Sequence, residues 1–193
     1  MDDIVLRAMQ KWPSVPQVFG WLRLDRRGQW LVKNASGGHE RIRNTALVEF
    51  INRNYDRDER GRWFFQNGPQ RVFVALDYTP WVCRLDDRAD ALVTHTGRTM
   101  GPLELLLLDE AGAMLVVAQP GVAVIDDRDL AALMERLGAE NASSAGIESV
   151  LERPLVGLFG RPVPLAGIRA EDVPGRFAFD PRPVPPAGMP ECS

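Results

Sequence analysis

Short apolar runs that alternate with polar residues recur along this chain of 193 residues, and turns of the form Asp-x-x-Gly join several of them. The first example, Leu24-Asp25-x-x-Gly28-x-Trp30-Leu31-Val32, is matched 84 positions later by Leu108-Asp109-x-x-Gly112-x-Met114-Leu115-Val116, and Asp58-x-x-Gly61-x-Trp63 is a weaker third example. Alternation indicates half-buried strands, and glycine supplies the positive φ of a tight hairpin loop. The pattern therefore predicts a protein built largely of β-hairpins. Two explanations stay open: hairpin turns favour Asp and Gly in general, or a hairpin-plus-helix unit is duplicated.

Helical spacing of apolar residues occurs in three segments, which cover residues 3–12, 45–55 and 127–137. Pro13 ends the first segment, Asn44 or Thr45 can cap the second, and Asp126 or Asp127 the third. Residues 62–66, 71–76 and 81–85 are predicted to form three antiparallel strands, and residues 103–109, 114–119 and 122–125 a second group. One more short helix fits within residues 147–158. The predicted fold class is α+β, with mainly antiparallel sheets built from two hairpin-plus-helix units.

Composition along the chain suggests three segments. Residues 1–90 form an N-terminal hairpin-helix-sheet unit and residues 91–160 a second sheet-helix unit. Residues 161–193 form a Pro-rich, extended C-terminal tail. Phe177 and Phe179, at strand spacing, are the expected anchors that hold this tail on the body of the protein. A sheet edge or the tail could also mediate a homodimer, in which case the chain would be a structural subunit.

Composition and charge are those of a globular protein, with 45% hydrophobic and 25% charged residues. Acidic residues at the start and the lack of a long uncharged apolar run favour a soluble, cytoplasmic protein without a membrane partner. Cys83 and Cys192 are expected to be reduced thiols. The first 78 residues carry 13 basic and 9 acidic side chains, but the whole chain has a net charge of −3 and no recognised nucleic-acid motif. Nucleic acid is therefore not an expected partner.

Candidate catalytic groups are few and scattered. His39 and Glu40 follow a Gly-rich turn, and carboxylates gather at Asp86, Asp87 and Asp90 and again at Asp126, Asp127 and Asp129. A small-molecule hydrolase could use His39, Glu40 and one Asp cluster if the fold brought them together. The second cluster also suits a helix N-terminus, and His95 suits a hydrogen-bonded position in a sheet. We expect no metal site and no cofactor, because no triad, metal-ligand spacing or phosphate-binding loop occurs.

The most distinctive candidate for binding is a predicted hairpin rich in aromatic and amide side chains. Its candidate binding residues are Trp63, Phe65, Gln66, Asn67, Gln70, Arg71 and Trp81. Such residues could line a site for a polar ligand or a peptide, with Arg71 as a donor for a carboxylate or phosphate. The same residues could equally form a core and a turn, because one buried aromatic side chain removes roughly 150–250 Å² from water. The favoured function is a non-enzymatic module that binds a small molecule or a protein.

Several sequence motifs resemble those of an uncharacterised proteobacterial family of unknown function. They are Lys11-Trp12-Pro13-x-Val15-Pro16, Gly20-Trp21-Leu22-x-Leu24-Asp25-Arg26-Arg27-Gly28-x-Trp30, Phe50-Ile51-Asn52-Arg53-Asn54-Tyr55, and the run from Gly61 to Val72. The resemblance extends to about residue 137. It implies a bacterial, cytosolic protein and transfers no catalytic or binding residue.

Overall fold

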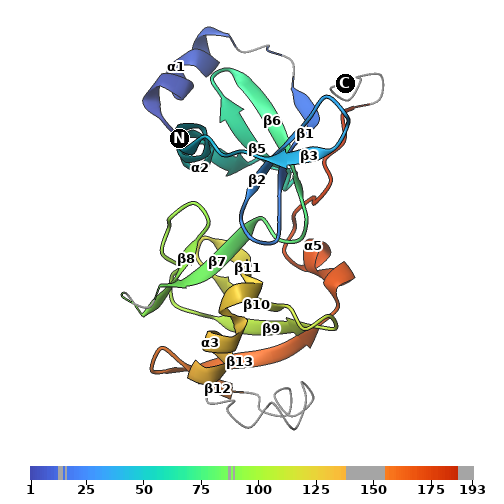
Figure 1. Ribbon diagram of the computed structural model, residues 1–193. Coiled ribbons are helices and arrows are strands. Elements are labelled where there is room, and N and C mark those ends of the chain that lie inside the picture. The colour runs from blue at the N-terminus through green and yellow to red at the C-terminus, as the bar shows by residue number, and fades with distance from the viewer. Residues whose placement is uncertain (13–14, 16, 87, 89, 138–154, 187–193) are drawn as a thin grey trace. The chain divides into compact units, whose positions relative to one another are not determined.

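The computed structural model describes every residue except 13–14, 16, 87, 89, 138–154 and 187–193, which Figure 1 draws as a thin grey trace. The described chain is α+β, and it divides into two compact units. Unit 1 comprises Met1–Pro80 and Ala178–Ser193, and unit 2 comprises Trp81–Phe177. Among the described helices, none combines the length and the apolar character needed to cross a bilayer.

Unit 1 contains a six-stranded sheet with the order β3-β2-β1-β6-β5-β4. Its elements are α1 (Asp3–Lys11), β1 (Val18–Leu24), β2 (Trp30–Lys33), β3 (His39–Arg41), α2 (Thr45–Arg53), β4 (Tyr55–Arg57), β5 (Trp63–Asn67) and β6 (Gln70–Leu76). β1 and β6 are parallel, and every other neighbouring pair is antiparallel. The Asn44 side chain caps α2 by accepting a hydrogen bond from the Leu47 amide, as its sequence position predicts.

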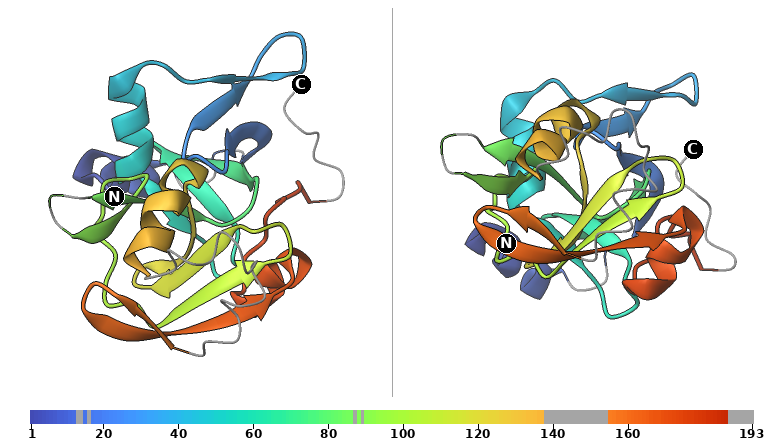
Figure 2. Two further views of the ribbon diagram at one scale, coloured as in Figure 1. Left: turned by 60° about the horizontal axis from the view of Figure 1, so that its bottom comes forward. Right: turned by 90° about the horizontal axis from the view of Figure 1, so that it is seen from below.

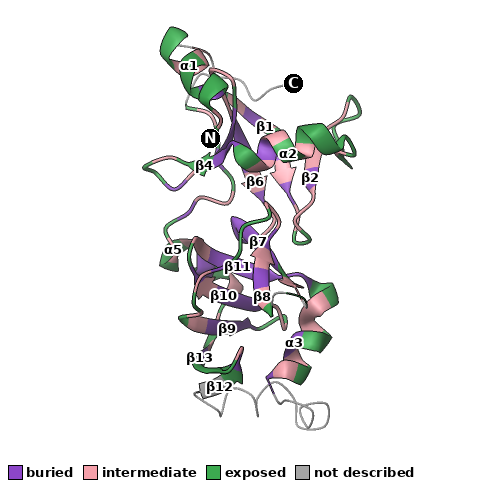
Figure 3. Cartoon of the chain, turned by 90° about the vertical axis from the view of Figure 1, so that its left-hand side faces the viewer, coloured by how far each residue is buried: buried purple, intermediate pink, exposed green. Residues whose placement is uncertain are grey.

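Consecutive residues of β5 and β6 are buried, so both faces of the six-stranded sheet are covered around these strands. Figure 3 colours buried residues purple. On one face the Phe50 ring of α2 meets the Phe65 ring edge-on at 5.4 Å. On the other face Phe19 stacks on Phe73 at 4.5 Å, and Phe64 completes the cluster. These aromatic contacts fix α2 and β1 against the central strands, because each ring buries a large apolar area.

Unit 2 contains a seven-stranded sheet with the order β12-β13-β9-β10-β11-β7-β8. The sheet curls, so that its two ends approach one another in the view from below in Figure 2. Its strands are β7 (Trp81–Asp86), β8 (Ala91–Thr94), β9 (Leu105–Asp109), β10 (Met114–Ala118), β11 (Gly121–Ile125), β12 (Leu155–Leu158) and β13 (Arg161–Ile168). Its helices are η1 (Asp127–Asp129), α3 (Leu130–Arg136), η2 (Ala170–Asp172) and α5 (Val173–Arg176).

Most neighbouring strands are antiparallel, as expected, but each sheet also contains at least one parallel pair, so both sheets are mixed rather than purely antiparallel. β7 pairs with β11 in parallel and β9 pairs with β13 in parallel. The prediction that β7 continues the antiparallel group of β5 and β6 is wrong, because β7 belongs to the other sheet. Residues 155–158, predicted as the end of a helix, form strand β12. Residues 147–154 lie outside the described part.

The Asp-x-x-Gly turns have one common construction. In each, the Asp side chain accepts hydrogen bonds from the backbone N–H groups two and four residues later, and the glycine N–H donates to the Asp carbonyl. Asp25, Asp58 and Asp109 build three such turns, and Thr94 builds a related one with its hydroxyl. The turn recurs outside the two long repeats, so it is not by itself evidence of duplication.

Strand order and register favour a duplicated unit. β3-β2-β1-β6-β5 of unit 1 corresponds to β11-β10-β9-β13-β12 of unit 2, and in both the central pair is parallel. Leu24 pairs with Trp30 in the first hairpin, and Leu108 pairs with Met114 at the same 84-residue offset in the second. A helix follows the third strand of each set, α2 after β3 and α3 after β11.

The predicted tail is divided between the two units, because residues 161–177 form β13, η2 and α5 of unit 2 and the chain from Ala178 onwards belongs to unit 1. Phe179 is buried there, whereas Phe177, at the end of unit 2, is half-exposed. The Asp180 amide donates to the Gly61 carbonyl at 3.0 Å, and the Leu76 amide donates to the Pro181 carbonyl at 2.8 Å. Residues 187–193 lie outside the described part, and so does the thiol of Cys192.

Candidate functional site

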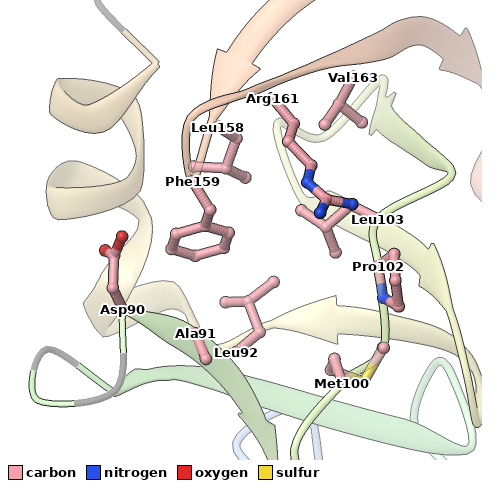
Figure 4. Close-up of a pocket in the computed structure, with 11 residues that line it drawn as sticks. Asp90, Ala91, Leu92, Met100, Pro102, Leu103, Leu158, Phe159, Arg161 and Val163 are labelled. Carbon is pink, nitrogen blue, oxygen red and sulfur yellow. The ribbon is translucent and has the colours of Figure 1, made fainter.

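A cavity of about 250 Å³ lies within unit 2, between the two ends of the curled sheet (Figure 4). β8 provides one wall, the segment from Met100 to Leu103 a second, and the β12–β13 hairpin a third. Most of the lining is apolar: Ala91, Leu92, Met100, Pro102, Leu103, Leu158, Phe159 and Val163. Gly101, Asp90 and Arg161 complete it. The cavity is thus an apolar space with one acidic and one basic side chain at its border.

The β12–β13 hairpin places an aromatic ring and a guanidinium at this cavity. Leu158 pairs with Arg161, so only Phe159 and Gly160 form the turn. Their φ angles are +50° and +70°. Two successive positive φ angles give a hairpin turn that matches strand twist, but a bulky aromatic residue rarely adopts this conformation. Backbone strain of this kind concentrates at functional sites. In Figure 4 the side chains of Phe159, Arg161 and Leu92 point towards the same space.

The electrostatics of the cavity favour an anion. Asp90 forms an ion pair with Arg136 of α3, so its charge is already compensated. The Arg136 guanidinium also lies 5.8 Å from the centre of the Phe159 ring. Arg161 is exposed, and no described acidic side chain forms an ion pair with it. A guanidinium offers a planar fork of donors that matches a carboxylate or a phosphate.

A second cavity, of about 460 Å³, lies in unit 1 beside Trp21, Lys33 and the turn formed by residues 34–37. Its lining has one large apolar side chain, that of Trp21, and is otherwise polar or small. Because ligand sites are mostly apolar with a few polar groups, the cavity of unit 2 is the better candidate for a small molecule.

The candidate binding residues of the aromatic hairpin are placed mainly in the interior. Trp63, Phe65 and Gln66 are 7%, 4% and 1% exposed. Trp81 is also buried, but it lies on β7 of unit 2. Trp63 and Phe65 face the side of the sheet that α2 covers, and Trp63 lies 4.8 Å from the Tyr55 ring.

The polar end of that hairpin remains at the surface. Asn67 is exposed, and Gln70 and Arg71 are half-buried. The Arg71 guanidinium lies over the Phe64 ring at 4.5 Å, and its Nε donates to Gln66 Oε1 at 3.4 Å. The turn consists of Gly68 and Pro69, with Asn67 paired to Gln70, and it lines neither of the two cavities.

The histidines have different environments. His39 and Glu40 lie on the exposed strand β3 of unit 1, where neighbouring side chains point to opposite faces of the sheet. His95 is half-buried in unit 2, its Nδ1 accepts a hydrogen bond from the Val82 amide at 3.3 Å, and desolvation of the ring lowers its pKa to about 3. His95 is therefore a neutral, structural side chain at neutral pH.

The second carboxylate cluster and Cys83 occupy structural positions in unit 2, whereas Asp87 of the first cluster lies outside the described residues. The fully buried Asp126 accepts from the Arg128 amide at the start of η1 and pairs with Arg128 and Arg84. Asp129 also pairs with Arg84. Burial raises the pKa of the Cys83 thiol far above its usual range. Among the described residues, no group of three or more His, Cys, Asp or Glu side chains could hold a metal ion.

Sequence reasoning did not identify Phe159 and Arg161, because no local pattern marks them. The duplication supplies an indirect signal. The β5–β6 hairpin and the β12–β13 hairpin occupy equivalent places in the two sheets, and both have two-residue turns. Gln70 of the predicted binding hairpin therefore corresponds to Arg161 at the cavity of unit 2.

Comparison with known proteins indicates no specific function for the chain. No curated protein shows significant sequence similarity to the chain. A crystal structure of a DUF1285 family protein from Silicibacter pomeroyi DSS-3 is similar in fold, with a TM-score of 0.51 and 20% sequence identity. The similarity covers 90% of this chain and 98% of that one. A family model described as "Protein of unknown function (DUF2946)" matches residues 1–184, and the chain therefore belongs to this family, to which no specific function is assigned.

Proposed function

We propose that the protein is a non-enzymatic ligand-binding module that takes a small, apolar carboxylate or phosphate into the cavity of unit 2. One observation carries the proposal: the exposed guanidinium of Arg161, which pairs with no acidic side chain in the described part of the chain, borders an apolar cavity of about 250 Å³. The apolar part of the ligand would lie against Leu92, Leu103 and Phe159, and its anionic group would lie at Arg161.

The size of the cavity limits the ligand. Cavities that hold drug-sized molecules usually measure about 300–1,000 Å³, so this one suits a smaller molecule. Apolar burial would supply most of the affinity at about 25 cal/mol per Å² of area removed from water, while the ion pair would set the orientation and the preference for an anion. An apolar cation would lose the ion pair and be repelled by Arg161, and a neutral polar molecule would lose both contributions.

The proposed setting is the cytoplasm of a bacterium. Cys83, the cysteine among the described residues, is a free and buried thiol, which suits a reducing compartment. The similar crystal structure is of a bacterial protein, which supports a bacterial origin.

The test is a calorimetric titration with a graded set of probes. Hexanoate, octanoate, decanoate and phenylacetate present an apolar body and a carboxylate, whereas octanol and octylamine are the neutral and cationic controls. We expect saturable binding of at least one carboxylate and no binding of octylamine. Failure of all four carboxylates, or equal binding of octanol and octanoate, would contradict the proposed anion site.

Three variants locate the binding. Arg161→Gln should weaken carboxylate binding about tenfold and leave octanol unaffected, because a charge-assisted bond contributes roughly 1.5–3 kcal/mol. Ala91→Phe should fill the cavity and abolish binding of every probe. Arg43→Gln, which removes an exposed positive charge from unit 1, is the matched control and should bind as the wild type does.

A further inference from the structure

The outer edge of the six-stranded sheet in unit 1 is formed by β3, a strand whose three residues are all exposed. On its inner side β3 pairs with β2, and no other described strand pairs with its outer side. An open strand edge presents backbone donors and acceptors that another strand can use.

The register shows which backbone groups face the open side. The Ile42 amide donates to the Trp30 carbonyl and the Asn34 amide donates to the Gly38 carbonyl, each at 2.8 Å. Because hydrogen-bonded and non-hydrogen-bonded pairs alternate in an antiparallel ladder, Glu40 uses its backbone groups towards β2. His39 and Arg41 are the non-hydrogen-bonded positions. Their N–H and C=O groups therefore point away from β2, towards the open edge.

The side chains along this edge are mainly basic on one face of the sheet. His39 lies opposite Lys33 and Arg41 lies opposite Leu31, so the three basic side chains share one face. Glu40 points to the other face. Between Arg26 and Val48 the sequence holds five Arg or Lys residues, and Glu40 is the one acidic residue. An added strand would meet the imidazole of His39 and the positive charge of Arg41 at two alternate positions, with Lys33 beside them on the same face, and the negative charge of Glu40 between them.

We propose that the β3 edge binds an extended acidic segment of a partner protein by strand addition. Two acidic side chains of that segment, separated by one neutral residue, would lie beside His39 and Arg41, and its backbone would pair with theirs. The short length and the charges of β3 also limit pairing between identical edges, because two such edges would repel one another. The same charges attract an acidic strand. This site is independent of the cavity in unit 2.

The test uses a fluorescent peptide with alternating Glu and Val, measured by fluorescence anisotropy on the full-length protein. Two control peptides have the same composition with the glutamates placed together, or Lys in place of each Glu. We expect the alternating peptide to bind best and its affinity to fall as salt increases. Equal binding of the three peptides would overturn the proposal.

Two variants separate the backbone and side-chain contributions. Arg41→Pro removes the outward N–H while the inner ladder bonds of Glu40 and Ile42 remain, and it should weaken binding about fivefold or more. Lys33→Gln combined with Arg41→Gln should weaken it about tenfold and remove most of the salt dependence. Unchanged affinity in both variants would overturn the proposal.

Two control variants test specificity within unit 1. Glu40→Gln alters the other face of the sheet, and Arg7→Gln removes an exposed charge from α1. Both should bind within about twofold of the wild type. An equal loss in Arg7→Gln would show a general charge effect and overturn the proposal. Far-UV circular dichroism and the melting temperature identify any variant that fails to fold, in which case the comparison of the three peptides on the wild-type protein decides.

Two other occupants would also overturn the proposal. A dimer that dissociates in Arg41→Pro, together with no peptide binding, would assign the edge to a second copy of the chain. Tighter binding of a single-stranded oligothymidylate than of the peptide, lost in the Lys33→Gln and Arg41→Gln double variant, would assign it to nucleic acid.

Discussion

Asp126 is the buried charge on which the start of η1 depends. Burial alone would raise its pKa, but the hydrogen bonds and the positive charge of Arg128 outweigh burial and lower the pKa to about 2. The side chain of Asp126 is fully buried, while those of Arg128 and Arg84 are half-exposed. Removing the charge of Asp126 therefore breaks its ion pairs with Arg84 and Arg128. Of these three side chains, Asp126 is the one that solvent cannot reach.

Asp126→Asn should lower the free energy of unfolding at pH 7 by about 1–3 kcal/mol. Since the pKa of Asp126 in the folded protein lies below the ordinary 3.8, its contribution is complete above about pH 5 and is lost as the pH falls towards 2. Between about pH 5 and pH 2, the free energy of unfolding should therefore fall less in Asp126→Asn than in the wild type. Urea unfolding across this range measures both effects. Asp172→Asn, at an exposed helix start in the same unit, should change stability by at most about 0.5 kcal/mol.

Cys83 should be chemically inert in the folded protein. It is fully buried, its Sγ lies 3.6 Å from the Val124 carbonyl, and burial raises its thiol pKa. The thiolate is the reactive species, so reaction requires unfolding. In a Cys192→Ser protein, an aromatic disulfide reagent should titrate no thiol without denaturant and one in urea. Rapid reaction of the native protein would show that β7 opens locally.

At the scale of elements, the returning C-terminal segment depends on a glycine. Gly61 has a φ of +76°, and an added Cβ would lie 2.3 Å from the Ala178 carbonyl oxygen. Because backbone lies at that position, Gly61→Ala cannot be accommodated by a side-chain rotation and should destabilise the protein by about 2 kcal/mol or more. Gly68→Ala is the matched control, with a positive φ and open space around it.

Equilibrium unfolding in urea distinguishes the two glycine variants. Gly68→Ala should cost about 1 kcal/mol, from backbone strain alone. The difference between the variants measures how firmly residues 178–181 bind to unit 1. Equal losses would mean that the segment can separate from Gly61 at no cost.

Elements that depend on local chemistry could be predicted, and those that depend on distant partners could not. The turn at Asp25 and the cap of α2 at Asn44 follow from side chains within a few residues of the backbone groups that they satisfy. The sheet to which β7 belongs does not follow from neighbouring side chains in this way. Its partner β11 lies some forty residues away, and the apolar alternation of a strand is the same whichever sheet it joins.

At the scale of the whole molecule, the duplication links the predicted site to the observed one. Aromatic and amide side chains indicate a binding site at the β5–β6 hairpin, but most of its aromatic rings are buried in the core. The equivalent hairpin of unit 2 leaves Phe159 and Arg161 at a cavity. Asp90 and Arg161 are 71 positions apart in the sequence, so the closure of a curled sheet, which no local pattern encodes, brings them to one site.

The most direct test of the cavity in unit 2 is an NMR titration of the uniformly ¹⁵N-labelled protein with octanoate. The account predicts that the largest shifts cluster at the amides of Ala91, Leu92, Leu103 and Phe159 and at the Nε–H of Arg161, and that Arg161→Gln strongly reduces the amide shifts at the same, sub-saturating ligand concentration. Shifts confined to unit 1, or shifts that persist undiminished in Arg161→Gln, would contradict it.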